Sequence, residues 1–148
     1  MTRTATDYTV LAAAIIGILL AAYAVGLHYA PSSSSFCDIN ASWNCDKVNK
    51  SPWAVFMGVP VAILGLLAYL VLFAITFKRG AIQKFLSFTA DDYYKYLFVY
   101  AIVMFGFQAY LTYIEAFVIG AYCIVCLGSQ TCTIVVATAV GARALRNN

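Results

Sequence analysis

Two cysteine pairs are the residues of this chain whose types and spacing could do chemistry. Cys123-Ile124-Val125-Cys126 opens a long apolar run, and Cys37 and Cys45 stand eight residues apart in a polar loop. On a helix, side chains three residues apart lie on one face, where two sulfurs can form and break a disulfide. The pattern therefore predicts thiol–disulfide redox chemistry, although the loop pair taken alone is more typical of a structural disulfide.

Haem and zinc are less well supported by the same cysteines. Leu127, not histidine, follows Cys126, which disfavours attachment of a c-type haem. Four thiolates could hold zinc, but the loop pair lacks the tight two-to-four-residue spacing of structural zinc sites. We therefore expect no metal. The fifth cysteine, Cys132, lies on the same apolar run, and we expect it to pack as a small hydrophobic side chain.

The segments that carry these cysteines are apolar enough for a membrane. Of the 148 residues, 64% are hydrophobic and only 10% are charged, whereas a soluble domain carries about 25% charged residues. Four apolar segments approach the ~20 residues that a bilayer requires, and helices are the only open structures whose backbone groups are satisfied in lipid. These segments cover about residues 8–30, 53–77, 96–114 and 120–140.

The sequence thus predicts one domain over residues 1–148, an all-α bundle of four transmembrane helices with an outer loop over 31–52. The first segment is too long for the apolar part of a usual signal peptide, so we expect a retained helix. The spans leave no residues for a water-soluble catalytic domain. No basic run with interleaved aromatics indicates nucleic acid.

The placement of charge predicts the orientation of the bundle. Seven of the nine Lys and Arg residues fall in the N-terminus, the connection over 78–95 and the C-terminus, and only Lys47 and Lys50 fall on the other side. Positive charge accumulates on the cytoplasmic side, so both termini should be cytoplasmic. Both cysteine pairs would then lie at the outer face, in or near an oxidising compartment.

Residues around the second predicted helix indicate local structure. Ser51-Pro52 is typical of a helix start, with a serine cap and proline at the first helical position. Pro60 lies within the predicted helix and should kink it. His28 and Glu115, near the outer ends of the first and third helices, are expected to be interfacial.

In this order the elements resemble the vitamin K epoxide reductase family and its prokaryotic homologues. The resemblance covers roughly residues 8–140. In the bacterial Dsb-type thiol oxidase, another quinone-linked four-helix protein, the CxxC lies in the first outer loop, so the order is reversed. The matching residues are Cys37-Asp38-Ile39-Asn40-Ala41-Ser42-Trp43-Asn44-Cys45, Ser51, Phe56-Met57-Gly58-Val59-Pro60 and Cys123-Ile124-Val125-Cys126.

The resemblance implies a membrane thiol:quinone oxidoreductase that supports disulfide bond formation. Electrons would pass from an extracytoplasmic thioredoxin-like protein to a quinone, either ubiquinone or menaquinone (vitamin K). Cys37 would face the external protein, Cys45 would exchange with Cys123, and Cys126 would react with the quinone. Ser51 would lie near the catalytic thiols.

The resemblance also implies a quinone pocket formed by Cys126, Phe56, Gly58 and Gln130. Gln130 stands where the animal enzymes have a quinone-holding tyrosine, and a helix–helix contact explains it equally well. Ala54 stands where they have a pocket asparagine, and both differences favour the prokaryotic role over epoxide reduction. Many prokaryotic relatives carry a fused thioredoxin-like domain; none follows here, so we expect a separate partner protein.

Two alternatives remain open at this point. The same cysteine relay could serve a quinone or quinone-epoxide reductase driven by external thiols. The chain could also be a non-enzymatic membrane protein whose outer loop is held by a disulfide, in which case Cys126→Ala would change only stability.

Overall fold

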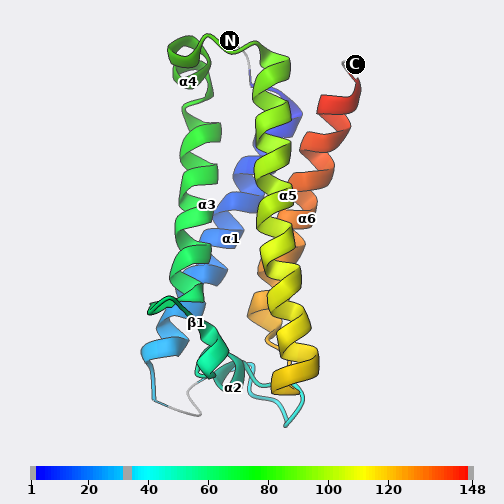
Figure 1. The fold of residues 1–148 in the computed structure, drawn as a ribbon. Helices are drawn as coiled ribbons and strands as arrows, with labels where there is room; N and C mark the ends of the chain where they lie inside the picture. The colour runs from blue at the N-terminus through cyan, green and yellow to red at the C-terminus, as the bar shows by residue number, and fades with distance from the viewer. Residues whose placement is uncertain (1–2, 32–34, 147–148) are drawn as a thin grey trace.

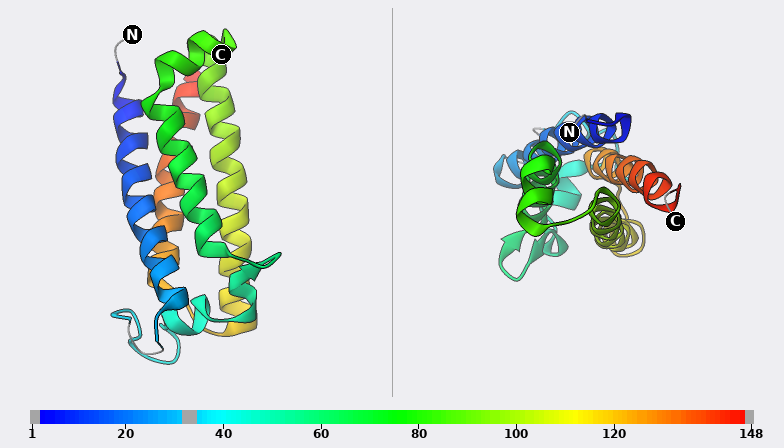
Figure 2. Two further views of the ribbon diagram at one scale, coloured as in Figure 1. Left: turned by 90° about the vertical axis from the view of Figure 1, so that its left-hand side faces the viewer. Right: turned by 90° about the horizontal axis from the view of Figure 1, so that it is seen from above.

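The computed structural model describes residues 3–31 and 35–146 and is a bundle of four long helices (Figure 1). Residues 32–34 of the predicted outer loop lie outside the described part of the chain. The first long helix packs against the second and the fourth, and the fourth also packs against the third. Seen from above, the helices surround a common axis (Figure 2). They are α1 (Ala5–Tyr29), α3 (Val61–Phe77), α5 (Ala90–Ile114) and α6 (Ile124–Arg146).

The prediction of a transmembrane helical protein is confirmed. The described residues form three helices that can each span a membrane, or four if one bent pair of helices counts as a span. Helices α1, α6 and α5 with its extension to Ile119 are each long and apolar enough to cross a membrane. Helix α3 has 17 residues and reaches the required length only together with α4 (Arg79–Leu86), from which it is bent by 80°. The chain is therefore a multi-pass membrane protein.

Polar caps move the ends of two helices beyond the apolar segments. Helix α1 starts at Ala5 because Thr4 and Asp7 form a capping box, and Thr89 does the same for α5 with Asp92. Both helices consequently begin several residues before the predicted positions. Helix α6, in contrast, starts at Ile124, four residues later than predicted, and continues to Arg146.

The prediction of a helix from residue 53, kinked at Pro60, is wrong. Residues Pro52–Ala54 form a 3-10 turn (η1), and β1 (Val55–Phe56) pairs antiparallel with β2 (Val59–Pro60) before α3 begins. Pro60 is the residue that precedes Val61, the first of α3. Proline is tolerated at a helix start because a backbone N–H there has no partner within the helix.

The turn of this hairpin explains why a segment of apolar residues is not helical. Met57 and Gly58 both have positive φ, 51° and 83°, as the two central residues of a type I′ turn require. Glycine adopts this conformation without steric cost. The Met57 side chain is 88% exposed, so the hairpin projects from the bundle (Figure 2).

The core of the bundle is held by close approach of α1 and α3. Tyr69 of α3 is fully buried, and its ring lies against Gly17 of α1, where a Cβ would overlap it. Small residues at such crossings let membrane helices pack closely. Cys132 is buried in the same cluster, as predicted for a small hydrophobic side chain.

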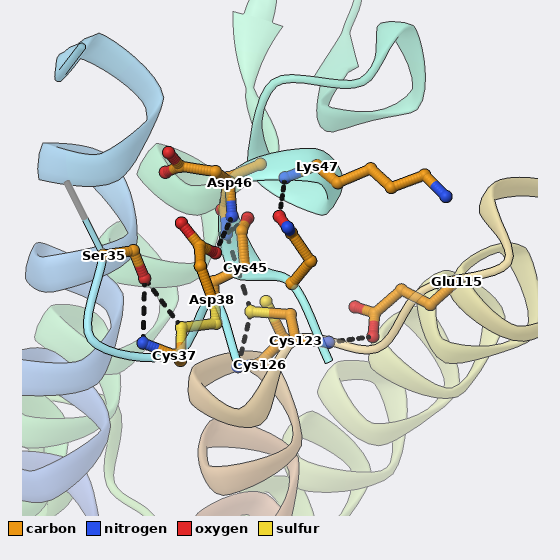
Figure 3. The surroundings of a disulfide bond; sticks show 11 residues. Ser35, Cys37, Asp38, Cys45, Asp46, Lys47, Glu115, Cys123 and Cys126 are labelled. Atoms are coloured by element: carbon orange, nitrogen blue, oxygen red, sulfur yellow. Dashed lines mark hydrogen bonds between the residues drawn. A yellow bond between two sulfur atoms is a disulfide. The ribbon is translucent and has the colours of Figure 1, made fainter. Parts of the chain in front are cut away.

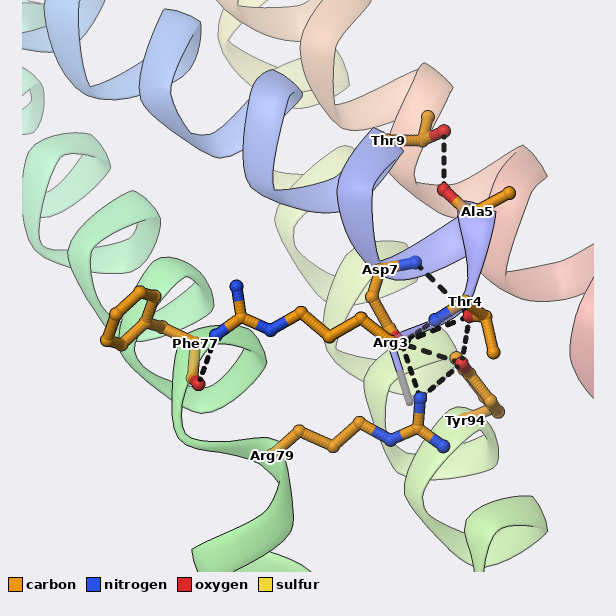
Figure 4. A network of polar contacts seen from close by, with 8 residues as sticks. All are labelled: Arg3, Thr4, Ala5, Asp7, Thr9, Phe77, Arg79 and Tyr94. Atoms are coloured by element: carbon orange, nitrogen blue, oxygen red, sulfur yellow. Dashed lines mark hydrogen bonds and ion pairs between the residues drawn. The ribbon is translucent and has the colours of Figure 1, made fainter. Parts of the chain in front are cut away.

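A buried ion pair secures the end of the bundle that carries both termini (Figure 4). The carboxylate of Asp7, 1% exposed, pairs with Arg79 at the start of α4 and accepts a hydrogen bond from the Tyr94 hydroxyl at 3.1 Å. The Arg79 guanidinium also donates to the Tyr94 oxygen at 2.9 Å. These contacts join α1, α4 and α5. The short helix α2, which begins at Cys45, lies at the opposite end (Figure 1).

Candidate active site

The four paired cysteines meet at one end of the bundle (Figure 3). Cys37 and Cys45 form a disulfide with their Cα atoms 5.7 Å apart, and Cys123 and Cys126 are free thiols. Cys37, Cys45 and Cys123 are fully buried and belong to one apolar cluster, against which Cys126 packs. Tertiary structure thus joins two pairs that are far apart in sequence.

Backbone pairing holds the disulfide loop against the CxxC segment. Trp43 and Tyr122 form a parallel bridge, in which the Tyr122 N–H donates to the Ser42 carbonyl at 2.7 Å. The Asn44 N–H donates to the Tyr122 carbonyl at 3.1 Å, and the rings of Trp43 and Tyr122 pack in a tilted arrangement with their centroids 5.4 Å apart. Since Cys45 and Cys123 directly follow these paired segments, the bridge places the loop disulfide beside the CxxC.

Asn49 connects the two cysteine pairs through its side-chain amide. It ends the short helix α2 (Cys45–Asn49) and is 6% exposed. Its Nδ2 donates to the Cys45 carbonyl at 2.9 Å and to the Cys123 sulfur at 3.5 Å. The Asn49 carbonyl in turn hydrogen-bonds Nδ1 of His28 on α1 at 2.6 Å. One side chain therefore contacts both pairs.

The CxxC lies at the N-terminus of α6. Cys123 directly precedes the helix, and its sulfur accepts a hydrogen bond from the Cys126 N–H at 3.2 Å, as a capping side chain does. Gly120, with φ of 65°, turns the chain from the π-helical turn Glu115–Ile119 (η2) into this segment. Both sulfurs consequently lie at the first turn of the helix.

A cavity of about 120 Å³ opens beside Cys126. Its wall is mainly apolar and is built by residues of α1, α3, α5 and α6 together with the segment over 48–54. Cys126 is part of this wall, whereas Cys123 is not. The polar residues of the wall are His28, Asn49, Ser51, Gln108, Thr112, Glu115 and Ser129.

Glu115, predicted as an interfacial residue, is buried in this wall. Its side chain is 3% exposed, and Oε2 accepts a hydrogen bond from the Cys123 N–H at 3.0 Å (Figure 3). The π-helical turn that follows α5 directs the carboxyl toward the start of α6. In the sequence, the position of Glu115 is marked only by a single acidic residue within an apolar run.

A model of the vitamin K epoxide reductase family matches residues 8–140. The chain belongs to this family. Its members are thiol:quinone oxidoreductases, so the protein is an enzyme in which thiols reduce a quinone. The alternative of a non-enzymatic, disulfide-stapled membrane protein does not hold for a member of the family. The matched region includes both cysteine pairs, all of α3 and α5, and most of α1 and α6.

The cavity suits the quinone substrate of this family. Small-molecule sites are mostly apolar with a few placed polar groups, and the Cys126 thiol stands in such a wall. Gln108 on α5 donates to the Ser129 hydroxyl at 3.3 Å and to the Tyr69 hydroxyl at 3.4 Å. Its side-chain oxygen is buried without a hydrogen-bond partner in the described part of the chain. A buried acceptor of this kind fits a hydroxyl group of the quinol product, since the carbonyls of a quinone do not donate hydrogen bonds.

Three residues that the sequence predicts to bind the quinone are not part of the cavity wall. Phe56 is 52% exposed in the hairpin and packs edge-on against Phe107, and Gly58 forms the hairpin turn. Gln130 accepts a hydrogen bond from the Thr112 hydroxyl at 2.8 Å, which is the helix–helix contact considered as its alternative. Sequence reasoning did not single out Gln108, which lies in the wall instead.

Ser51, which the family resemblance places near the catalytic thiols, lies in the cavity wall together with Cys126. Its hydroxyl donates to the Val48 carbonyl at 2.8 Å. Ser51 precedes the turn η1 with Pro52 at the first position and makes no side-chain cap. The expected Ser-Pro start is therefore present, although it starts a 3-10 turn and not α3.

Proposed function

We propose that this enzyme oxidises a thioredoxin-like protein outside the cytoplasm and thereby supports disulfide bond formation. Electrons pass through Cys37 and Cys45 to Cys123 and Cys126, and then to ubiquinone or menaquinone. The observation that carries the proposal is the packing of a disulfide and a free CxxC in one buried cluster, with one cysteine in the wall of an apolar cavity.

Each transfer between the pairs is a thiol–disulfide exchange. Cys37 is buried in the oxidised loop, so the loop must open before the partner reaches it. A thiolate of the partner then attacks Cys37, which breaks the Cys37–Cys45 bond, and the second partner thiol completes its own disulfide. The reduced Cys45 then attacks Cys123 of an oxidised CxxC and releases Cys126 as a thiolate. Cys37 attacks Cys45 in turn, so the loop disulfide forms again and Cys123 is released. Two electrons have then moved to the CxxC.

The position of each CxxC sulfur supports a division of roles. Cys126 is in the cavity wall, and Cys123 shares the hydrogen bonds of Asn49 with Cys45. Cys126 therefore faces the quinone and Cys123 exchanges with the loop. Closure of the Cys123–Cys126 bond releases two electrons and two protons, which convert the quinone to the quinol.

The cysteine end of the bundle is assigned to the outer face of the membrane. Arg3, which precedes α1, and Arg79, the first residue of α4, lie at the opposite end of the bundle. Cytoplasmic segments are rich in Lys and Arg, and an oxidising outer compartment suits a persistent Cys37–Cys45 disulfide.

Epoxide reduction is a less suitable function for this cavity. Ala54 lies in the wall and offers no hydrogen bond, and the Gln130 side-chain oxygen is engaged by Thr112. Ala54 and Gln130 thus replace the pocket asparagine and the quinone-holding tyrosine of the animal enzymes. We therefore favour quinone reduction.

The direct test is quinone reduction by purified protein in detergent, followed by absorbance with a reduced thioredoxin-like protein and ubiquinone or menaquinone analogues. Cys126→Ala should abolish turnover. Cys132→Ala is the matched control, since Cys132 is buried in the other apolar cluster and should leave turnover unchanged. If the wild type oxidises no thiol with any of these quinones, the proposed function is wrong.

The order of the relay has its own test. Cys37→Ala removes the thiol that resolves the bond between the pairs, so a Cys45–Cys123 disulfide should accumulate during turnover. Non-reducing peptide mapping by mass spectrometry identifies this bond. Its consistent absence, or accumulation of a Cys45–Cys126 bond, would contradict the order.

A further inference from the structure

We propose that Glu115 is a catalytic residue that carries protons from the CxxC thiols to the quinone. This inference rests on the proposed function, because it concerns the step in which the CxxC reduces the quinone in the cavity. Glu115 would be the group that transfers protons during quinone reduction, in a site enclosed by apolar helices.

The placement of Glu115 joins the thiols and the cavity. The carboxyl lies in the cavity wall and is 3% exposed, so it has little access to bulk water. Oε2 accepts the Cys123 N–H at 3.0 Å, which holds the carboxyl at the first turn of α6 (Figure 3). Cys126 belongs to the same cavity wall. Glu115 is thus beside both the reacting sulfur and the space for the substrate.

Among the residues that the structure describes, no Lys or Arg forms an ion pair with the Glu115 carboxyl. Within the described residues, the cavity wall contains no Lys or Arg, and its titratable groups are His28, Glu115 and Cys126. His28 comes from α1 and is engaged by the Asn49 carbonyl, and α3 contributes only apolar groups and Gly65 to the wall. Cys123 is the other titratable neighbour, through its backbone contact. Glu115 is therefore the carboxyl available for proton transfer.

Electrons and protons balance if the Glu115 carboxyl transfers one proton on each of two occasions in a turnover. Reduction of a quinone to a quinol consumes two electrons and two protons, and closing the Cys123–Cys126 bond supplies both. Glu115 accepts the Cys126 proton as the sulfur becomes a nucleophile and passes it to one quinone oxygen. The regenerated carboxylate then takes the Cys123 proton and delivers it to the second oxygen. Glu115 is unchanged at the end.

Glu115→Gln separates proton transfer from a structural role. Glutamine has nearly the same shape and keeps an oxygen that accepts the Cys123 N–H, but it cannot carry a proton. We expect kcat for quinone reduction to fall about 100-fold, in line with the usual contribution of general acid–base catalysis. The KM for quinone should change less than about twofold, and one limb of the pH profile of kcat should disappear.

A measurement without quinone distinguishes this inference from the proposed function. Thiol–disulfide exchange between the reduced partner and the oxidised CxxC should proceed at the wild-type rate in Glu115→Gln. Asp91→Asn is the matched acid-to-amide control, because Asp91 lies in the first turn of α5 at the far end of the bundle. It should leave exchange, kcat and the pH profile unchanged.

The outcomes are separable. A wild type without thiol-dependent quinone reduction refutes the proposed function, and with it the inference. A fully active wild type together with a Glu115→Gln variant of unchanged kcat and pH profile refutes the Glu115 inference alone. If Glu115→Gln does not fold, Glu115→Asp decides: its shorter carboxyl should displace the pH profile, and an unchanged profile overturns the inference.

Discussion

Replacing Asn49 with alanine should lower the reduction potential of the Cys123–Cys126 pair by about 20–60 mV. Asn49 donates to the Cys123 sulfur at 3.5 Å, and a reduced sulfur is a better acceptor than a disulfide sulfur. The hydrogen bond therefore stabilises the reduced pair. Its loss makes the pair harder to reduce, which corresponds to a lower potential.

The magnitude follows from the two hydrogen bonds of one amide. The bond to the Cys45 carbonyl, at 2.9 Å, is present in both redox states of the CxxC and cancels from the potential. The bond to Cys123 is worth about 1 kcal/mol with a neutral partner and up to about 3 kcal/mol with a charged one. For a two-electron couple, about 1.4 kcal/mol corresponds to 30 mV, which gives the stated range.

The assay is equilibration of the protein with dithiothreitol buffers of known potential, followed by alkylation and mass spectrometry of the CxxC peptide. Asn44→Ala is the matched control. Asn44 caps α2 by accepting the Lys47 N–H at 2.7 Å, so its loss costs about 1 kcal/mol of stability without touching a cysteine sulfur. An unchanged potential in Asn49→Ala, or an equal shift in Asn44→Ala, would refute the reasoning.

Two further predictions concern the stability of the bundle in detergent, measured as the midpoint of thermal unfolding. Gly17→Ala should destabilise the protein by about 1–3 kcal/mol, because the new Cβ overlaps the buried Tyr69 ring. Gly26→Ala on the same helix is the control and should not lower the midpoint, because the space at its Cβ is open. Equal effects of the two substitutions would argue against close packing of α1 and α3. Asp7→Ala should cost about 3–5 kcal/mol by leaving the Arg79 guanidinium without its buried partner; a loss under about 1 kcal/mol would indicate that this pair is not part of the stabilising core.

Local sequence patterns determined the class of this protein and the cysteines of its candidate active site. Hydropathy reveals four apolar segments because lipid accepts only long apolar helices, and three or four spans are present. Cysteine types and spacings, such as Cys123-x-x-Cys126, are likewise visible without a structure. Together with the segments between them, they were sufficient to indicate the family over residues 8–140, which the family model matches.

Hydropathy alone does not predict where the helices and strands of this chain begin and end. Capping by Thr4 and Thr89 extends two helices into polar sequence, because side-chain oxygens satisfy N–H groups that the helix leaves free. The apolar residues 55–60 form a hairpin, since backbone pairing and the positive φ of Gly58 outweigh their apolar character.

Only the tertiary structure decided which polar side chains surround the cysteines. Asn49, Gln108 and Glu115 come from three different elements and are not distinguished in sequence from surface or interfacial residues. The packing of α5 and α6, together with the Trp43–Tyr122 bridge, brings them to one cavity beside Cys126. These three residues are candidates for function because they are buried and lie close to the cysteines or the cavity. Burial and proximity are properties of the folded chain and not of any local sequence pattern.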